Sequence, residues 1–260
     1  MYNFSKVFLP YCDGSSQTSD LSDPVTVGKS TIYYRGHRIL ISMIQKLTSP
    51  GGPLYGIEQL VVSGCSAGGL STFLHADEWA AALPGVQVVA MPDSGFFLDY
   101  NTTTPGKTGY GTALRWVYNR MNGTGGVPAA CRAANPNDEA KCIFAEHVAP
   151  TLKTPFFPLQ SQYDSWQVGN DLMNNTAAAV NTYGQLLSQR VQTDLLAANP
   201  NHGVFLDSCY HHCGDEWDAI SIDGQKQSAA FQQWYTTLGV NGAKKFWNQN
   251  QVYPCNSCCS

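Results

Sequence analysis

The chain is poor in charged residues. Only 13% of its 260 residues are Asp, Glu, Lys or Arg, the formal net charge is -4, and the Lys and Arg residues are scattered along the sequence. Proteins that bind nucleic acid or an anionic membrane gather basic residues on one segment or face. We therefore expect no nucleic-acid partner and no membrane-surface partner.

Long apolar runs are also absent, and no stretch approaches the roughly 20 residues that a membrane-spanning helix needs. The N-terminal stretch "MYNFSKVFLPYCDGSS" has neither the basic region nor the apolar region of a secretory signal. No shift in composition marks a domain boundary. The length therefore predicts a single domain over residues 1–260.

Cysteine, in contrast, is abundant. Nine cysteines are many for a reducing compartment, and Cys131 with Cys142, like the group Cys255, Cys258 and Cys259, has a spacing that suits local bridges. We expect disulfides and a secreted protein. Four N-x-S/T sequons, which are typical of secreted glycoproteins, agree with this expectation and lie at Asn3, Asn101, Asn122 and Asn174.

Zinc is the rival interpretation of the cysteines. Two thiol pairs have nearly the spacing of zinc ligands, and they are Cys209 with Cys213 and Cys255 with Cys258. Neither pair lies in a recognisable zinc knuckle. We therefore favour disulfides and expect no metal.

Apolar periodicity predicts a chain of alternating helices and strands. Residues 57–63 and 86–91 are short apolar strands around a helical segment at 66–83, which indicates a βαβ unit with a parallel sheet. A helix with an apolar face is expected near residues 38–47, and a long irregular loop after residue 92. Residues 114–152 look like a weakly helical insertion outside the core.

Further elements are expected on both sides of this region. Residues 6–11 are expected to form a first short strand, and the sheet is expected to resume in "TPFFPLQSQYD". A helix over 180–198 and a last strand in "GVFLDSC" follow, and a helix carrying Phe231 and Trp234 closes the chain.

The segment "GCSAG" places Ser66 in a G-x-S-x-G motif between a predicted strand and a predicted helix. In this context the serine lies on a sharp turn as a nucleophile, and side chains at Gly64 and Gly68 would collide with adjoining elements. A serine hydroxyl needs a histidine base and a carboxylate that orients the histidine, in the order serine, acid, histidine.

The candidate bases and acids for Ser66 lie at the ends of predicted strands. His211 and His212 both follow the strand "GVFLDSC", and spacing alone does not separate them. Asp164 ends "TPFFPLQSQYD" and is the preferred acid, although it also suits a helix N-cap. Asp93, which ends another strand, is the rival acid, and Asp207 lies inside its strand, where its side chain could point away.

Successive blocks of the sequence resemble the plant-type pectin acetylesterases, a carbohydrate esterase family that also contains the Wnt deacylase Notum. The blocks are "YCDGSS", "YYRGHRI", "GCSAGGLSTFLH", "DSGFFLD", "TPFFPLQSQYDSWQ", "SCYHHC" and "VYPCNSCC". The resemblance implies an α/β-hydrolase-like fold, with a mostly parallel sheet flanked by helices. It also implies that the N-terminal strands of the family, with their glycine-rich "GGGW" block, are missing.

The resemblance also implies roles for single residues. It makes Ser66 the nucleophile and Asp164 the acid, and its S-C-x-x-H-C pattern selects His212 as the base. The N-H of Ala67 is expected to supply one half of the oxyanion hole, and the other half belongs to the absent glycine-rich block.

The same resemblance extends to the substrate. Trp166, Phe96 and Phe97 are expected to line the substrate pocket. The implied activity is removal of acetyl groups from pectin, outside the cell or in the cell wall, by a monomer without a cofactor. The alternatives are a Notum-like lipid (palmitoleoyl) deacylase and a non-catalytic remnant that binds polysaccharide.

Overall fold

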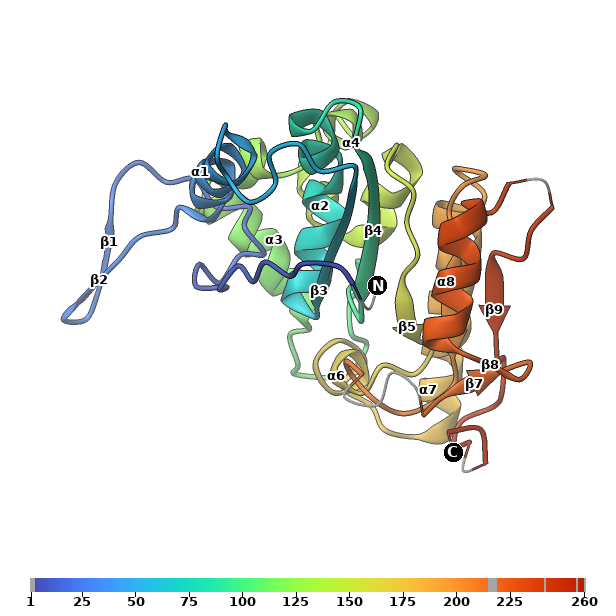
Figure 1. Ribbon diagram of the computed structural model, residues 1–260. Helices are drawn as coiled ribbons and strands as arrows, with labels where there is room; N and C mark the ends of the chain where they lie inside the picture. The colour runs from blue at the N-terminus through green and yellow to red at the C-terminus, as the bar shows by residue number, and fades with distance from the viewer. Residues whose placement is uncertain (1–2, 215–218, 241, 256, 260) are drawn as a thin grey trace.

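The computed structural model describes residues 3–214, 219–240, 242–255 and 257–259 (Figure 1). Its centre is a five-stranded sheet in the order β3-β4-β5-β6-β9, in which every neighbouring pair is parallel. The strands are β3 (Gln59–Cys65), β4 (Gln87–Asp93), β5 (Leu159–Ser161), β6 (Val204–Asp207) and β9 (Phe246–Asn248). The predicted parallel sheet is confirmed.

Helices connect and cover these strands. The α-helices are α1 (Gly36–Thr48), α2 (Ala67–Ala82), α3 (Tyr110–Arg120), α4 (Ala129–Ala134), α5 (Ala145–Val148), α6 (Ser165–Gln167), α7 (Ala177–Arg190) and α8 (Gln227–Thr237). Short 3-10 turns are η1 (Gly123–Gly126), η2 (Glu139–Ile143) and η3 (Ala149–Thr151), and π-helical turns are η4 (Val168–Leu172) and η5 (Val191–Leu196). None of the helices described is long and apolar enough to cross a bilayer.

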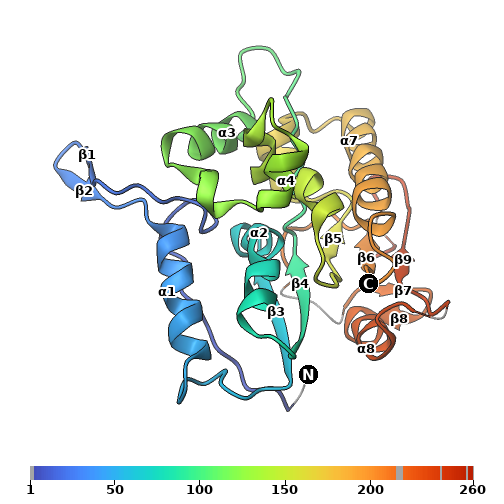
Figure 2. The same cartoon turned by 90° about the horizontal axis from the view of Figure 1, so that it is seen from above.

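Alternating side chains divide the core between the two faces of the sheet. Ala90 packs with Phe73 of α2 on one face, whereas Val89 and Met91 pack with Trp234 of α8 on the other. Figure 2 shows α8 on the opposite side of the sheet from α2 and α7. The apolar runs of the strands are thus explained by burial on both faces, as expected for a parallel sheet.

The segment expected as a peripheral insertion belongs to the core. Residues 129–151 form short helical turns, and Cys131, Ile143, Phe144 and Val148 have no exposed surface and belong to the same apolar cluster as Phe73 of α2. The prediction of an insertion is therefore wrong. Each turn is too short to show a helical period, so its buried side chains give no regular pattern in the sequence.

Two strand predictions are also wrong. Residues 6–11 form no strand; Tyr11 accepts a hydrogen bond from the N-H of Ser16, and Leu9 packs beside α1. The strand in "GVFLDSC" is not the last, because β9 follows α8 and buries Trp247. The sequence analysis also missed the antiparallel hairpins β1 (Val25–Val27) with β2 (Ser30–Ile32) and β7 (Ser221–Ile222) with β8 (Gln225–Lys226), although Asp223-Gly224 between the last two strands is a two-residue turn signal for a hairpin.

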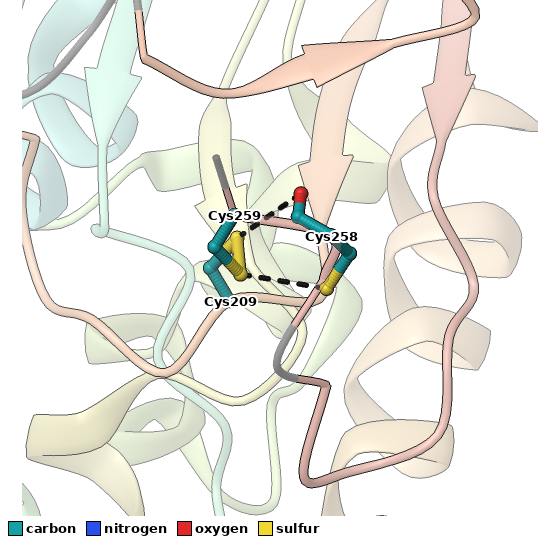
Figure 3. A group of neighbouring side chains, drawn as sticks. All are labelled: Cys209, Cys258 and Cys259. Carbon is teal, nitrogen blue, oxygen red and sulfur yellow. Dashed lines mark hydrogen bonds between the residues drawn. A yellow bond between two sulfur atoms is a disulfide. The ribbon is translucent and has the colours of Figure 1, made fainter.

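Four disulfides are formed, and the predicted bridge between Cys131 and Cys142 is one of them. The others are Cys65–Cys213, Cys209–Cys259 and Cys255–Cys258. Figure 3 shows the Cys209–Cys259 bridge with the sulfur of Cys258 beside it, 3.4 Å from that of Cys259. The four thiols of the rival zinc site are thus distributed over three bridges, and Cys12 is a free, exposed thiol.

We expect His202 to make the stability of the fold depend on pH. Its buried Nδ1 accepts a hydrogen bond from the N-H of Phe156, at 3.1 Å, and burial lowers the pKa of His202 to about 4, with a smaller contribution from Lys245. The unfolded chain, with an ordinary histidine pKa near 6.5, therefore binds the proton more readily. The contribution of His202 to the free energy of unfolding is therefore fully present above about pH 6.5, and it falls by about 3 kcal/mol as the pH drops to 4.

The matched variant is His202→Asn, whose side-chain oxygen can accept the same hydrogen bond but does not titrate. Urea unfolding at pH 7 and pH 4.5 should show a larger loss for the wild type, by about 2 kcal/mol. Equal losses in the two proteins would contradict a neutral, buried His202.

Candidate active site

Ser66 lies on a sharp turn between β3 and α2. Its φ of 57° is in the left-handed region that residues other than glycine seldom adopt. The N-H of Ser66 donates to the carbonyl of Asp93 at the end of β4, and the carbonyl of Ser66 accepts from Leu70 in α2. The turn therefore has the strained geometry that the motif predicts, and it fixes the serine at the carboxyl edge of the sheet.

Close backbone contacts surround this turn. A Cβ atom on Gly64 would lie 2.6 Å from the backbone of Gly68, whereas one on Gly68 would meet nothing within 4 Å. The expected collision therefore holds for Gly64 and is wrong for Gly68. The sequence analysis missed Gly69, where a Cβ atom would lie 2.5 Å from the carbonyl oxygen of Asp93 and 2.9 Å from the Cα of Gly95.

Asp164 is fully buried directly after β5. One carboxylate oxygen accepts a hydrogen bond from the N-H of Gln167 and caps α6, and the other lies 2.8 Å from Nδ1 of His212. The side-chain amide of Gln160 approaches the same carboxylate, at 3.5 Å. Asp164 is thus both an N-cap and a partner of histidine, so the two interpretations of this residue are compatible.

The structure distinguishes the two adjacent histidines. Because a carboxylate only accepts hydrogen bonds, Nδ1 of His212 carries the proton that faces Asp164, which leaves Nε2 as the basic nitrogen. Nε2 of His212 is buried and has no hydrogen-bond partner within the described ranges, including Ser66. The catalytic hydrogen bond between serine and histidine is often long or absent before substrate binds.

His211 instead pairs with Asp207. Its Nε2 lies 3.1 Å from that carboxylate, and its Nδ1 lies 3.3 Å from the carbonyl of Cys213, so both nitrogens face acceptors. Burial lowers the pKa of His211, but the hydrogen bond and charge of Asp207 outweigh it and raise that pKa to about 9. His211 is therefore protonated at neutral pH and poorly suited to accept a proton.

Asp93, the rival acid, helps to hold the loop that carries His212. One of its carboxylate oxygens accepts from the N-H of Gly214, and the hydroxyl of the next residue, Ser94, accepts from the N-H of Cys213. The disulfide between Cys213 and Cys65 adds a covalent link. This bridge joins the residue before Ser66 to the residue after His212, and the sequence analysis missed it because 148 positions separate the two cysteines.

Aromatic rings lie beside the histidine. Trp166, which is partly exposed, stacks on the ring of His212 with centroids 5.9 Å apart, and the rings of Tyr110 and Phe97 contact Trp166 edge-on. Phe96 and Phe97 are 0% and 1% exposed. The expectation that both phenylalanines line the pocket therefore has no support from their placement, because their side chains fill the core.

Ala67 is the first residue of α2. The N-H groups in the first turn of a helix have no acceptor within the helix and lie at the positive end of its dipole, which suits an oxyanion. Outside the Ser66 motif the sequence has two further glycine pairs, Gly51-Gly52 and Gly125-Gly126, and neither lies at this turn. Gly52 donates to Ser49 at the end of α1, and Gly126 packs against the backbone of Thr18.

A family model described as Pectinacetylesterase matches residues 1–260. The chain belongs to the pectinacetylesterase family. It is 31% identical to pectin acetylesterase 11 of Arabidopsis thaliana over 82% of this chain and 58% of that protein, so it spans less than two thirds of that relative's length. It is 28% identical to the human palmitoleoyl-protein carboxylesterase NOTUM over 91% of this chain and 50% of that protein.

Among solved structures, the Wnt deacylase Notum from Drosophila resembles this pectinacetylesterase family member. The TM-score is 0.82 with 25% sequence identity, over 97% of this chain and 73% of that one. Together with the parallel sheet and its flanking helices, this likeness confirms the α/β-hydrolase-like fold.

We expect Gly69→Ala to destabilise this pectinacetylesterase family member strongly. The added methyl group would overlap the backbone where α2 meets the segment after β4, and overpacking of this kind typically costs about 1–3 kcal/mol. Gly68→Ala is the matched control, because the added methyl group meets open space and alanine favours a helix over glycine by about 1 kcal/mol. Urea unfolding of both variants would test the expectation, and equal stabilities would contradict the close approach.

Loss of the Cys65–Cys213 bridge should loosen the loop that carries His212. In a Cys65→Ser/Cys213→Ser variant, hydrogen exchange of the backbone amides at residues 213 and 214 should rise at least tenfold, because only non-covalent contacts then hold the loop. The control, Cys131→Ser/Cys142→Ser, should leave these amides protected. Unchanged exchange in the first variant would mean that the contacts with Asp93 and Ser94 suffice.

Proposed function

We propose that this chain is a serine carboxylic-ester hydrolase that removes acetyl groups from pectin. The observation that carries the proposal is the contact between Asp164 and Nδ1 of His212, formed at the same sheet edge as the strained turn of Ser66. This arrangement has the order and roles of a serine, acid and histidine triad. Membership in the pectinacetylesterase family supports the acetyl ester as substrate.

In the proposed mechanism, Nε2 of His212 takes the hydroxyl proton of Ser66 while the serine oxygen attacks the acetyl carbonyl carbon. The N-H of Ala67 donates to the oxyanion. The bond to the sugar oxygen then breaks, and the imidazolium of His212 returns its proton to the departing sugar hydroxyl. Water hydrolyses the acetyl-serine by the same route and releases acetate, and Asp164 holds the histidine in position throughout.

The remaining features fit a polysaccharide substrate outside the cell. Trp166 offers a partly exposed ring next to His212, suited to stacking on a sugar, and four disulfides suit an oxidising compartment. We therefore propose an acetylated galacturonan as the substrate, the cell wall or extracellular space as the location, and a monomer as the active form.

A second candidate is a lipid deacylase. Several relatives are named palmitoleoyl-protein carboxylesterases, and the solved structure cited above is titled a Wnt deacylase. A long acyl chain needs a deep apolar pocket. Hydrolysis rates for matched acetyl and octanoyl esters distinguish the candidates: a strong preference for octanoyl would favour the deacylase.

Substitutions in the triad test the assignment directly. Ser66→Ala should abolish acetate release from acetylated pectin, and His212→Gln should lower kcat by about 10⁶-fold. His211→Gln is the matched control and should change kcat less than tenfold, because that histidine pairs with Asp207 and not with Asp164. Full activity in Ser66→Ala would refute the mechanism, and folded wild-type protein whose Ser66 resists a fluorophosphonate probe would favour a non-catalytic binding protein.

A further inference from the structure

Two histidines and a glutamate converge between α1 and α2, apart from the triad. His37 lies in the first turn of α1, and His75 and Glu78 lie one turn apart on α2. Nε2 of His37 is 2.9 Å from one carboxylate oxygen of Glu78, and Nδ1 of His75 is 3.0 Å from the other. The three ligating atoms lie within 4.8 Å of one another, and the two rings are stacked.

Both ring nitrogens of His75 face oxygen acceptors. The ring is 1% exposed, and its Nε2 lies 3.2 Å from the carbonyl oxygen of Ser16, which accepts the N-H of that nitrogen. A neutral imidazole has one N-H, so Nδ1 of the neutral ring would face the carboxylate of Glu78 with a lone pair. A metal ion that binds this lone pair and the carboxylate removes the conflict.

We propose that His37, His75 and Glu78 bind a zinc ion between α1 and α2. Two imidazole nitrogens and one carboxylate are an established ligand set for zinc, with a fourth position open to water. The carbonyl of Ser16 has the role of an outer partner, because a histidine that binds metal typically donates its other N-H to a backbone carbonyl or a carboxylate. Calcium and magnesium prefer oxygen ligands, so this set of donors favours zinc.

The other groups of potential ligands do not offer such a site. Asp99 and Glu146, which lie near His147, already pair with the guanidinium groups of Arg115 and Arg190. Glu78, in contrast, pairs with the two imidazoles and with no Lys or Arg of the described segments.

The cysteine group also differs. Cys209 and Cys259 are joined to each other, and Cys258 is joined to Cys255, so these sulfurs are not free thiolates. The cluster of His37, His75 and Glu78 therefore has unmodified donor atoms, and no Lys or Arg side chain of the described residues pairs with its carboxylate.

The ion would connect three separate parts of the chain. α1 supplies His37, α2 supplies His75 and Glu78, and the turn that contains Ser16 orients His75. The side chains of His37 and Glu78 are 16% and 34% exposed, so an ion from solvent can reach them. We expect the bound ion to stabilise the pair of helices, because a ligand that binds the folded state alone raises its stability.

Titration of the full chain with ZnCl₂ tests the proposal. All proteins carry Cys12→Ser, because this exposed free thiol would compete for zinc. Calorimetry should show one ion per chain, and thermal unfolding should show a higher Tm with zinc than after chelation. His37→Gln and Glu78→Gln should each weaken binding at least about tenfold and remove most of the increase in Tm.

His147→Gln is the matched control, since this histidine also lies beside carboxylates and should leave zinc affinity unchanged. Circular dichroism confirms that each variant is folded, and substitution of Co²⁺ for Zn²⁺ should give the visible absorption of a tetrahedral site with nitrogen ligands only in proteins that retain the cluster. The proposal is overturned if folded protein binds no zinc, or if His37→Gln and Glu78→Gln bind it as tightly as the parent.

Discussion

The site depends on the close approach of two backbones, the first turn of α2 and the segment after β4. A Cβ atom on Gly95 would lie 2.3 Å from the carbonyl carbon of Gly69, so neither position accommodates a side chain without movement. The contact holds Ser66 against the end of β4, where Asp93 accepts its N-H. Asp93 and Ser94 also hold the loop that carries His212. β4 therefore organises the site although it contributes none of the three proposed catalytic residues.

The parts that the sequence predicts correctly are those with local signals. Short apolar runs mark β3 and β4, the glycine-flanked serine marks the turn into α2, and the carboxyl ends of parallel strands meet at one edge of a sheet, which brings Asp164 and the histidines toward the serine. The choice between His211 and His212 has no such signal. It depends on which ring reaches which buried carboxylate, and the family pattern rather than the spacing selected His212.

The parts that the sequence does not predict depend on contacts between distant residues. The short turns over residues 129–151 belong to the core because residues of α2 and other distant segments pack against them. β9 is a strand because it pairs with β6. Sequence proximity suggested the bridge between Cys131 and Cys142, but it cannot pair Cys65 with Cys213 or Cys209 with Cys259. The same limit applies to His37 and Glu78, which are 41 positions apart and meet only because two helices pack together.

The Cys65–Cys213 bridge also determines whether proteolysis can separate the proposed catalytic residues. Residues 101–108 form an irregular, largely exposed segment between the nucleophile and the other two proposed catalytic residues. A single cut there would leave Ser66 on one fragment and Asp164 and His212 on the other. The bridge spans the cut, so the fragments would remain one covalent molecule and would part on a denaturing gel only after reduction. A nicked chain would thus keep the mass of the intact protein, apart from one added water.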